Sequence, residues 1–143
     1  MQYRKMGSLD WEVSALGFGC MRLPQRRINR MRADTEKSLR LIRHGIDLGI
    51  NYIDTAWPYH LGDSERILGQ ALQDGYRQRV HLVTKLPMPF VRRTEAFDRY
   101  LNSQLERLQT DYLDIYLFHG LNAGEFEKVK RLGLIEKMEE AQR

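Results

Sequence analysis

The fold is decided by the stretch Ile50-Asn-Tyr-Ile-Asp-Thr-Ala-Trp-Pro-Tyr-His60. Its first residues are mostly β-branched or aromatic, and Gly49 ends the helical pattern that precedes them, so they predict a short buried strand. Asp54 closes this strand, and a proline-containing loop then leads to Tyr59. Burying a carboxylate without a partner costs several kcal/mol of folding free energy. Asp54 therefore requires a nearby cation.

Two later apolar runs also end in ionisable residues. The run from Val80 ends at Lys85, which follows Asp54 by 31 residues, and the run from Tyr112 ends at His119, a further 34 residues along. Each interval is about one strand plus one helix, so in a parallel sheet all these strand ends point the same way. The groups expected to converge on one rim are Asp54, Tyr59, Lys85 and His119.

Each of these residues also has an ordinary structural interpretation. A lysine at a strand end is commonly a solvated cap, a histidine before glycine a hydrogen-bonded rim residue, and a tyrosine near proline part of turn packing. Four complementary titratable groups at successive strand ends are harder to explain in this way. They form the pattern by which barrel enzymes build active sites.

Helices are predicted between these strands. Asp34, Ser64 and Thr94 are each expected to cap one, and the helices end near Leu48, Asp74 and Leu108 respectively. After Gly120, two shorter helices are expected, separated by Gly133. Before the first helix, residues 3–14 predict a hairpin that turns at Gly7-Ser8, and residues 15–19 predict the first strand of the sheet.

The motifs resemble the aldo-keto reductase family. They are Asp54-Thr-Ala-x-x-Tyr59, then Ser64-Glu65, then Thr84-Lys85, then Asp111-Tyr-Leu-Asp-Ile-Tyr-Leu-Phe-His119. The segment from Tyr59 to Glu65 is similar to the branch whose longer members append an iron–sulfur segment. The resemblance runs from about Tyr3 to the last residue but covers only the first half of the family's barrel.

The resemblance implies an α/β fold of the TIM-type (β/α)8 barrel class. A complete barrel of this kind takes about 250 residues. The chain would supply only the N-terminal hairpin and about four β/α units, a half barrel, as a single domain over residues 1–143. The implied protein is the N-terminal part of such an enzyme, as a fragment or a truncated reading frame.

The resemblance also implies chemistry: reduction of an aldehyde or ketone by hydride transfer from NADPH or NADH. Tyr59 would donate the proton, and Lys85 would lower the pKa of Tyr59. Asp54 would hold Lys85 charged, and His119 would orient the carbonyl. The residues placed near the nicotinamide are Gly19, Cys20, Met21 and Asp54. No metal is expected, because His60 and His119 have no partner at ligand spacing.

Composition sets further expectations. The chain has 143 residues, 42% hydrophobic and 29% charged, which is typical of one globular domain. No apolar run approaches the length of a membrane helix, and no signal peptide is apparent, so we expect a cytoplasmic protein that binds no membrane. Cys20 is the only cysteine, whereas an iron–sulfur cluster takes about four ligands. No cluster is therefore expected in this chain.

A basic segment from Arg22 to Arg32 carries five arginines, and the formal net charge of the chain is +4. Such a segment could bind a polyanion, such as a nucleotide phosphate or a nucleic acid. A solvated loop is the favoured interpretation, and no nucleic-acid motif accompanies it. We therefore expect no nucleic-acid partner.

Two functions remain open at this point. The first is an NAD(P)H-dependent reductase acting on a small carbonyl compound. The second is a non-catalytic binding or regulatory subunit, or an inactive truncated fragment, that retains the same residues. In either case, a second copy or a missing C-terminal half is expected to complete the barrel.

Overall fold

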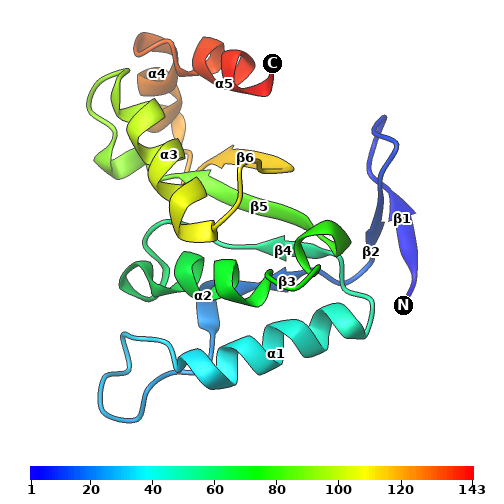
Figure 1. Ribbon diagram of the computed structural model, residues 1–143. Coiled ribbons are helices and arrows are strands. Elements are labelled where there is room, and N and C mark those ends of the chain that lie inside the picture. Colours follow the sequence, from blue (N-terminus) through cyan, green and yellow to red (C-terminus); the bar gives the residue numbers. More distant parts are fainter.

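The computed structural model describes every residue from Met1 to Arg143. Its centre is a four-stranded sheet in the order β3-β4-β5-β6, with every neighbouring pair parallel. Figure 1 shows the strands side by side, each followed by helical segments along the chain. The bounds of the strands are β3 (Phe18–Gly19), β4 (Tyr52–Asp54), β5 (His81–Leu86) and β6 (Ile115–Phe118). The predicted parallel sheet is confirmed.

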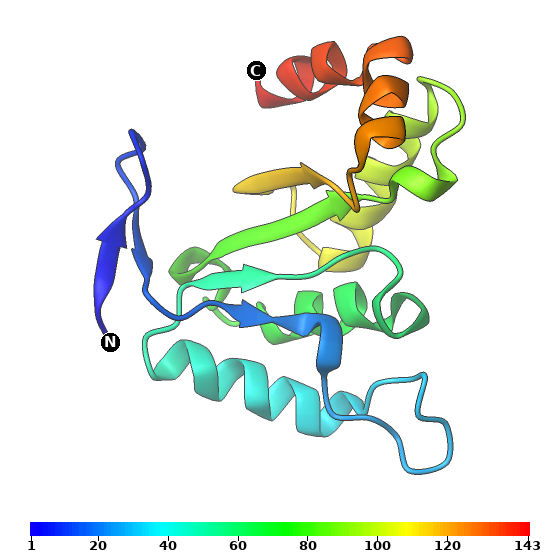
Figure 2. The same ribbon diagram turned by 180° about the vertical axis from the view of Figure 1, so that it is seen from behind.

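The predicted N-terminal hairpin is also confirmed. Strands β1 (Tyr3–Lys5) and β2 (Glu12–Ser14) pair antiparallel. Figure 2 shows this hairpin beyond the ends at which the sheet strands begin. Trp11 stacks on His81, the first residue of β5, with ring centroids 4.6 Å apart.

Strand β3 is shorter than the five residues predicted for it. The amide of Ala15 donates to the carbonyl of Gln2, and the hydroxyl of Ser14 donates to the carbonyl of Leu16. The first residues of the predicted strand are therefore tied to the hairpin. Only Phe18 and Gly19 pair with β4.

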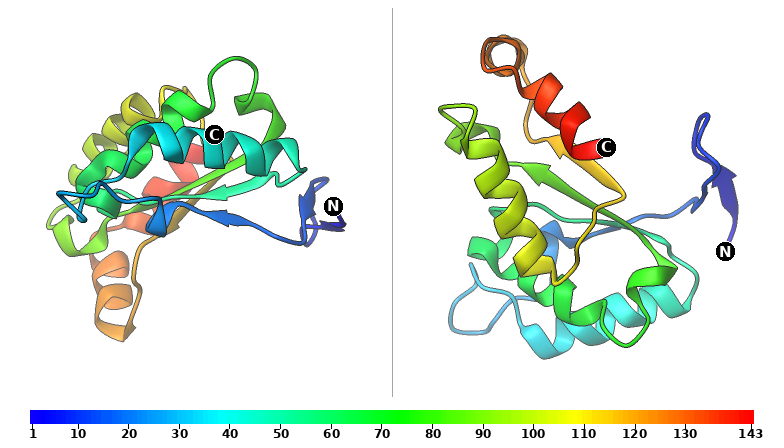
Figure 3. Two further views of the ribbon diagram at one scale, coloured as in Figure 1. Left: turned by 90° about the horizontal axis from the view of Figure 1, so that it is seen from below. Right: turned by 45° about the horizontal axis from the view of Figure 1, so that its top comes forward.

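Three longer helices connect the strands: α1 (Thr35–Asp47), α2 (Asp63–Ala71) and α3 (Ala96–Leu108). Figure 3 shows them on one face of the sheet. Asp34 caps α1 as predicted, because its carboxylate accepts from the amide of Lys37. The other two predicted caps are wrong. Ser64 lies inside α2, and the hydroxyl of Thr94 donates to the carbonyl of Leu132 instead of capping α3.

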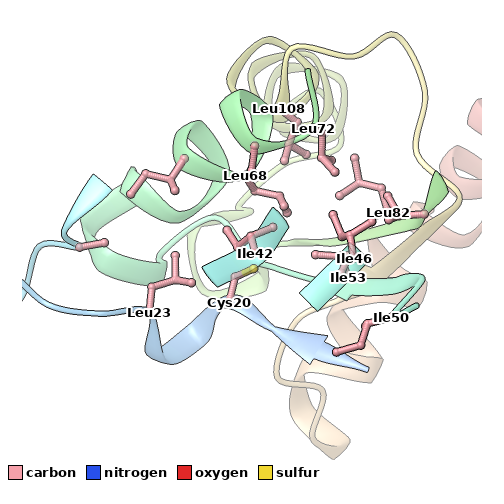
Figure 4. Packing of buried hydrophobic residues seen from close by; sticks show 14 residues of the cluster. Cys20, Leu23, Ile42, Ile46, Ile50, Ile53, Leu68, Leu72, Leu82 and Leu108 are labelled. Atoms are coloured by element: carbon pink, nitrogen blue, oxygen red, sulfur yellow. The ribbon is translucent and has the colours of Figure 1, made fainter. Parts of the chain in front are cut away.

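The main hydrophobic core fills the space between the sheet and α1 and α2. Figure 4 shows its side chains, among them Ile42 from α1, Ile53 from β4 and Leu68 from α2, all fully buried. A second cluster surrounds Phe97 of α3. It also includes Val129 and Leu134 from the helices that follow β6, namely α4 (Ala123–Arg131) and α5 (Leu134–Gln142).

Alternation along the strands separates the two faces of the sheet. Ile53 points toward the helices, so Tyr52 and Asp54 point the opposite way, as Ile115 and Leu117 do on β6. That face carries no helix, and Leu117 is 39% exposed. The edge strands β3 and β6 each have one neighbour. No helix has the length and apolar character that crossing a membrane would need.

Short 3-10 turns complete the chain, at Cys20–Arg22, Tyr59–Gly62, Arg77–Arg79 and Met88–Phe90. Except for Arg77–Arg79, which leads into β5, they follow the C-terminal ends of strands. Those three loops lie next to the rim at which the ionisable residues were predicted to meet.

Candidate active site

Asp54 and Lys85 form the ion pair that the sequence predicts. The Nζ atom of Lys85 lies 2.6 Å from Oδ1 of Asp54 and also donates to the carbonyl of Thr55 at 2.7 Å. The side chains of Lys85 and Asp54 are 13% and 28% exposed. The pair is therefore half enclosed but still reachable from the open side of the rim.

Tyr59 and His119 lie beside this pair. Their rings meet edge to face, with centroids 5.6 Å apart, and Nζ of Lys85 lies 5.4 Å from the centroid of the Tyr59 ring. Each of the four groups comes from a strand end or the loop after it. The structure thus brings all four predicted residues to one rim.

The pKa of Tyr59 is raised in this structure, whereas the resemblance implied that Lys85 would lower it. Burial, followed by the negative charge of Asp54, raises the pKa of Tyr59 above its ordinary value. Burial is the larger cause, and the Asp54 carboxylate adds to it because it contacts the Lys85 ammonium and offsets its charge. Tyr59 is consequently a protonated phenol at neutral pH.

His119 is shifted in the opposite direction. Burial and the charge of Lys85 lower the pKa of His119, against a smaller opposing effect of Asp54. The imidazole is therefore neutral at pH 7. A neutral ring carries one N–H donor, which suits hydrogen bonding to a carbonyl oxygen.

Of the four residues predicted near the nicotinamide, Asp54 lies in the ion pair, and the other three occupy different environments. Gly19 is the register partner of Asp54, and a Cβ atom built on it would meet nothing within 4 Å. Met21 is 55% exposed. Cys20 is fully buried in the main core, and burial strongly raises the pKa of its thiol. The thiol of Cys20 therefore faces the core, and the placement of this residue near the nicotinamide stays a prediction.

The basic segment folds back on itself. Gln25 and Ala33 form an antiparallel bridge, and Nε of Arg26 donates to the carbonyl of Ala33. Arg32 pairs with Asp63 at 2.6 Å. The remaining arginines of the segment are exposed. This arrangement agrees with the solvated-loop interpretation.

Sequence reasoning gave Glu65 no role of its own and so missed its importance. Glu65 is fully buried, and its carboxylate accepts from Thr84 at 2.9 Å and from Gln104 at 2.6 Å. Arg107 pairs with it at 3.2 Å. A usable signal was present, because Gln104 and Arg107 are polar residues three apart on the otherwise apolar face of α3.

No group of three or more histidine, cysteine, aspartate or glutamate side chains is arranged to hold a metal ion. The ionisable groups of the rim are the phenol of Tyr59, the ammonium of Lys85 and the neutral imidazole of His119, together with the Asp54 carboxylate. This set can donate a proton, stabilise developing negative charge and orient a polar oxygen.

The chain is similar in sequence to known oxidoreductases. The chain is 32% identical over 152 residues to the uncharacterized oxidoreductase YqkF of Bacillus subtilis, covering 94% of this chain and 47% of that protein. It is 40% identical over 87 residues to the methylglyoxal reductase YeaE of Escherichia coli, covering 61% of this chain and 30% of that protein. The chain thus spans about half the length, or less, of these relatives.

Solved structures give the same result. The holo form of aldo-keto reductase AKR11C1 from Bacillus halodurans matches with a TM-score of 0.71 at 34% identity, covering 92% of this chain and 47% of that one. An aldo-keto reductase from Klebsiella pneumoniae in complex with NADPH matches with a TM-score of 0.66 at 34% identity, covering 84% and 42%. The predicted partial (β/α) barrel is therefore confirmed.

The model of the aldo/keto reductase family matches residues 15–139, which include the whole parallel sheet and all four residues of the rim. By sequence and by fold, the chain belongs to the aldo/keto reductase family.

Proposed function

We propose that this chain carries the proton-donating half of a site that reduces an aldehyde or ketone to an alcohol with NADPH. The observation that supports the proposal most directly is the Lys85–Asp54 contact of 2.6 Å, beside the Tyr59 and His119 rings. An ion pair without other reactive groups beside it would not indicate catalysis. Here a phenol and a neutral imidazole share the same half-enclosed rim.

The residues divide the work by their chemistry. His119 donates its N–H to the substrate oxygen and orients the carbonyl. Tyr59, protonated at neutral pH, gives its proton to that oxygen as negative charge develops there. The resulting phenolate is stabilised by the ammonium of Lys85. Asp54 keeps that ammonium charged and in place.

The cofactor, when bound, supplies the hydride. Gly19, Met21 and Asp54 are the residues of this chain proposed to contact its nicotinamide, since the surface at Gly19 is open beside Asp54. Two similar aldo-keto reductases from Klebsiella pneumoniae were solved in complex with NADP and with NADPH, which is the basis for proposing NADPH over NADH.

The test is Tyr59→Phe in the longest native chain that contains this segment. Methylglyoxal is a reasonable first substrate, because a relative bears the name methylglyoxal reductase. The rate should fall by about 10² to 10⁴, the usual contribution of a general acid. NADPH affinity, measured by fluorescence titration, should not change.

Tyr112→Phe is the matched control, because it removes a phenol hydroxyl from an exposed residue before β6 and should leave the rate unchanged. Full turnover in Tyr59→Phe would exclude Tyr59 as the donor. A wild-type chain that binds NADPH but reduces no reactive aldehyde would favour the non-catalytic subunit instead.

A further inference from the structure

The loop that carries Tyr59 has an unusual backbone. His60, Leu61 and Gly62 follow Tyr59 directly, and all three have positive φ, at 53°, 55° and 88°. For residues with a side chain, the left-handed region costs about 1 to 2 kcal/mol each. His60 and Leu61 both carry this cost, whereas Gly62 does not, and two such residues in succession persist only where surrounding contacts impose the conformation.

Arg107 of α3 supplies contacts on both sides of Tyr59. Its Cζ atom lies 3.4 Å from the ring centroid of Trp57, two residues before Tyr59. Its Nη1 atom lies 3.2 Å from the position that a Cβ on Gly62 would take, three residues after Tyr59. The Trp57 ring also meets Tyr100 of α3 edge to face, with centroids 4.9 Å apart.

Arg107 is itself held by the buried carboxylate of Glu65. The contact is 3.2 Å, and the side chains of Arg107 and Glu65 are 16% and 0% exposed. Burial raises the pKa of Glu65, although Gln104, Thr84 and Arg107 all donate hydrogen bonds to it. Arg107 is the only cation that pairs with Glu65, so this contact ties its guanidinium to a fully buried carboxylate.

The same network reaches Lys85. The Nε2 atom of Gln104 donates both to Glu65 at 2.6 Å and to the carbonyl of Lys85 at 3.1 Å. Hydrogen bonds therefore connect the backbone of Lys85 through Gln104 and Glu65 to Arg107, whose stacking on the Trp57 ring reaches the loop of Tyr59. On the other side of the loop, Nε2 of His60 accepts from the amide of Leu23 at 3.0 Å.

We propose that Arg107 is a positioning residue for Tyr59, and that buried Glu65 holds it there. By stacking on Trp57 and packing against Gly62, the guanidinium keeps the left-handed loop closed and the phenol aligned with Lys85. This inference rests on the proposed role of Tyr59 as proton donor. It adds residues that touch neither the substrate nor the reacting atoms.

The first test reads the loop directly and needs no activity. The chain has two tryptophans, so Trp11→Phe leaves Trp57 as the only one. In that background, Glu65→Gln combined with Arg107→Met should shift the Trp57 emission to longer wavelength and increase its quenching by acrylamide. The double change leaves no buried unpaired charge, which favours a folded product.

The matched control removes an exposed Arg–Glu pair on α1 by combining Glu36→Gln with Arg40→Met. Its Trp57 emission should equal that of the parent. Arg107→Lys separates charge from shape, because lysine keeps the ion pair with Glu65 but lacks the planar face. It should melt near the parent temperature yet show the altered Trp57 emission.

The second test uses turnover in the longest native chain. Loss of alignment by about 1 Å can cost about 10²-fold in rate. We expect Arg107→Met combined with Glu65→Gln to lower kcat by up to that factor, with the KM for NADPH unchanged. In a Tyr59→Phe background the same double change should have almost no further effect, since the donor that it positions is gone.

Two results would overturn the proposal. One is an unchanged Trp57 emission and quenching in the folded double variant. The other is an equal loss of rate with and without Tyr59, which would indicate general destabilisation. If the wild-type protein shows no turnover, the proposed function fails, and the Trp57 measurement alone then decides whether Arg107 holds the loop.

Discussion

Removing the Asp54–Lys85 pair one residue at a time should show that the two side chains act as a unit. At 2.6 Å, and with the effective dielectric constant of about 20 that suits protein sites, the Coulomb attraction is about 6 kcal/mol. Desolvation of both groups offsets much of this value, because the side chains are only 13% and 28% exposed. Measured couplings between contacting residues reach about 3 kcal/mol. We expect about 2 kcal/mol for this pair.

The perturbation is a double-mutant cycle of Asp54→Asn, Lys85→Met and the combined variant. Either single change leaves one charge without its partner and should lower the free energy of unfolding by about 3 kcal/mol. The combined variant should lose about 2 kcal/mol less than the sum of the two. Lys85→Met also removes the bond to the Thr55 carbonyl, which is counted in its single cost and cancels in the cycle.

The assay is urea unfolding followed by far-ultraviolet circular dichroism at one fixed protein concentration. The exposed pair of Glu36 and Arg40 on α1 provides a control cycle, for which about 0.3 to 0.5 kcal/mol is expected. A coupling between Asp54 and Lys85 no larger than that of the control would refute the reasoning. The rim would then be held by its backbone alone.

Three further outcomes follow from other parts of the structure. Folding lowers the pKa of His119, so the unfolded chain binds more protons than the folded chain near pH 6. The stability that the neutral His119 contributes is therefore present above about pH 6.5 and is lost at lower pH. Melting temperatures from pH 7.5 to pH 5 should fall less steeply for His119→Asn than for the parent, and equal slopes would contradict the assignment. Gly69→Ala should lower the free energy of unfolding by about 1 to 3 kcal/mol, because the new Cβ would lie 2.6 Å from the Arg107 carbonyl oxygen. In the same thermal melts, Gly124→Ala on α4 should be neutral or stabilising. Light scattering of the 143-residue chain should show self-association through the open edges of β3 and β6, and a monodisperse monomer would contradict this expectation.

The strand ends were the predictable part of the site. Apolar runs that end in Lys85 and His119 are local patterns, and parallel pairing then requires their ends to meet. The cap of α1 was predictable for the same reason, since Asp34 and the amide of Lys37 are three residues apart. Local spacing contains all the information that these assignments need.

The missed features depend on partners far along the chain. The hydroxyl of Ser64 donates to the carbonyl of Cys20, 44 residues away, and so does not cap the start of α2. The cation that pairs with Glu65 is Arg107, 42 residues along. The pKa of Tyr59 is raised first by burial and then by the charge of Asp54, and both depend on tertiary packing that no local pattern gives.

The position of the hairpin offers a practical means of handling the protein. Its turn at Gly7 is exposed, and an added Cβ there would meet nothing within 4 Å. The hairpin lies at the beginning of the strands, opposite the rim, as Figure 2 shows. A fluorophore, an affinity tag or a surface linker inserted at this turn would therefore leave access to Tyr59 and His119 free. Immobilisation through the hairpin would present the open rim to solution in one orientation.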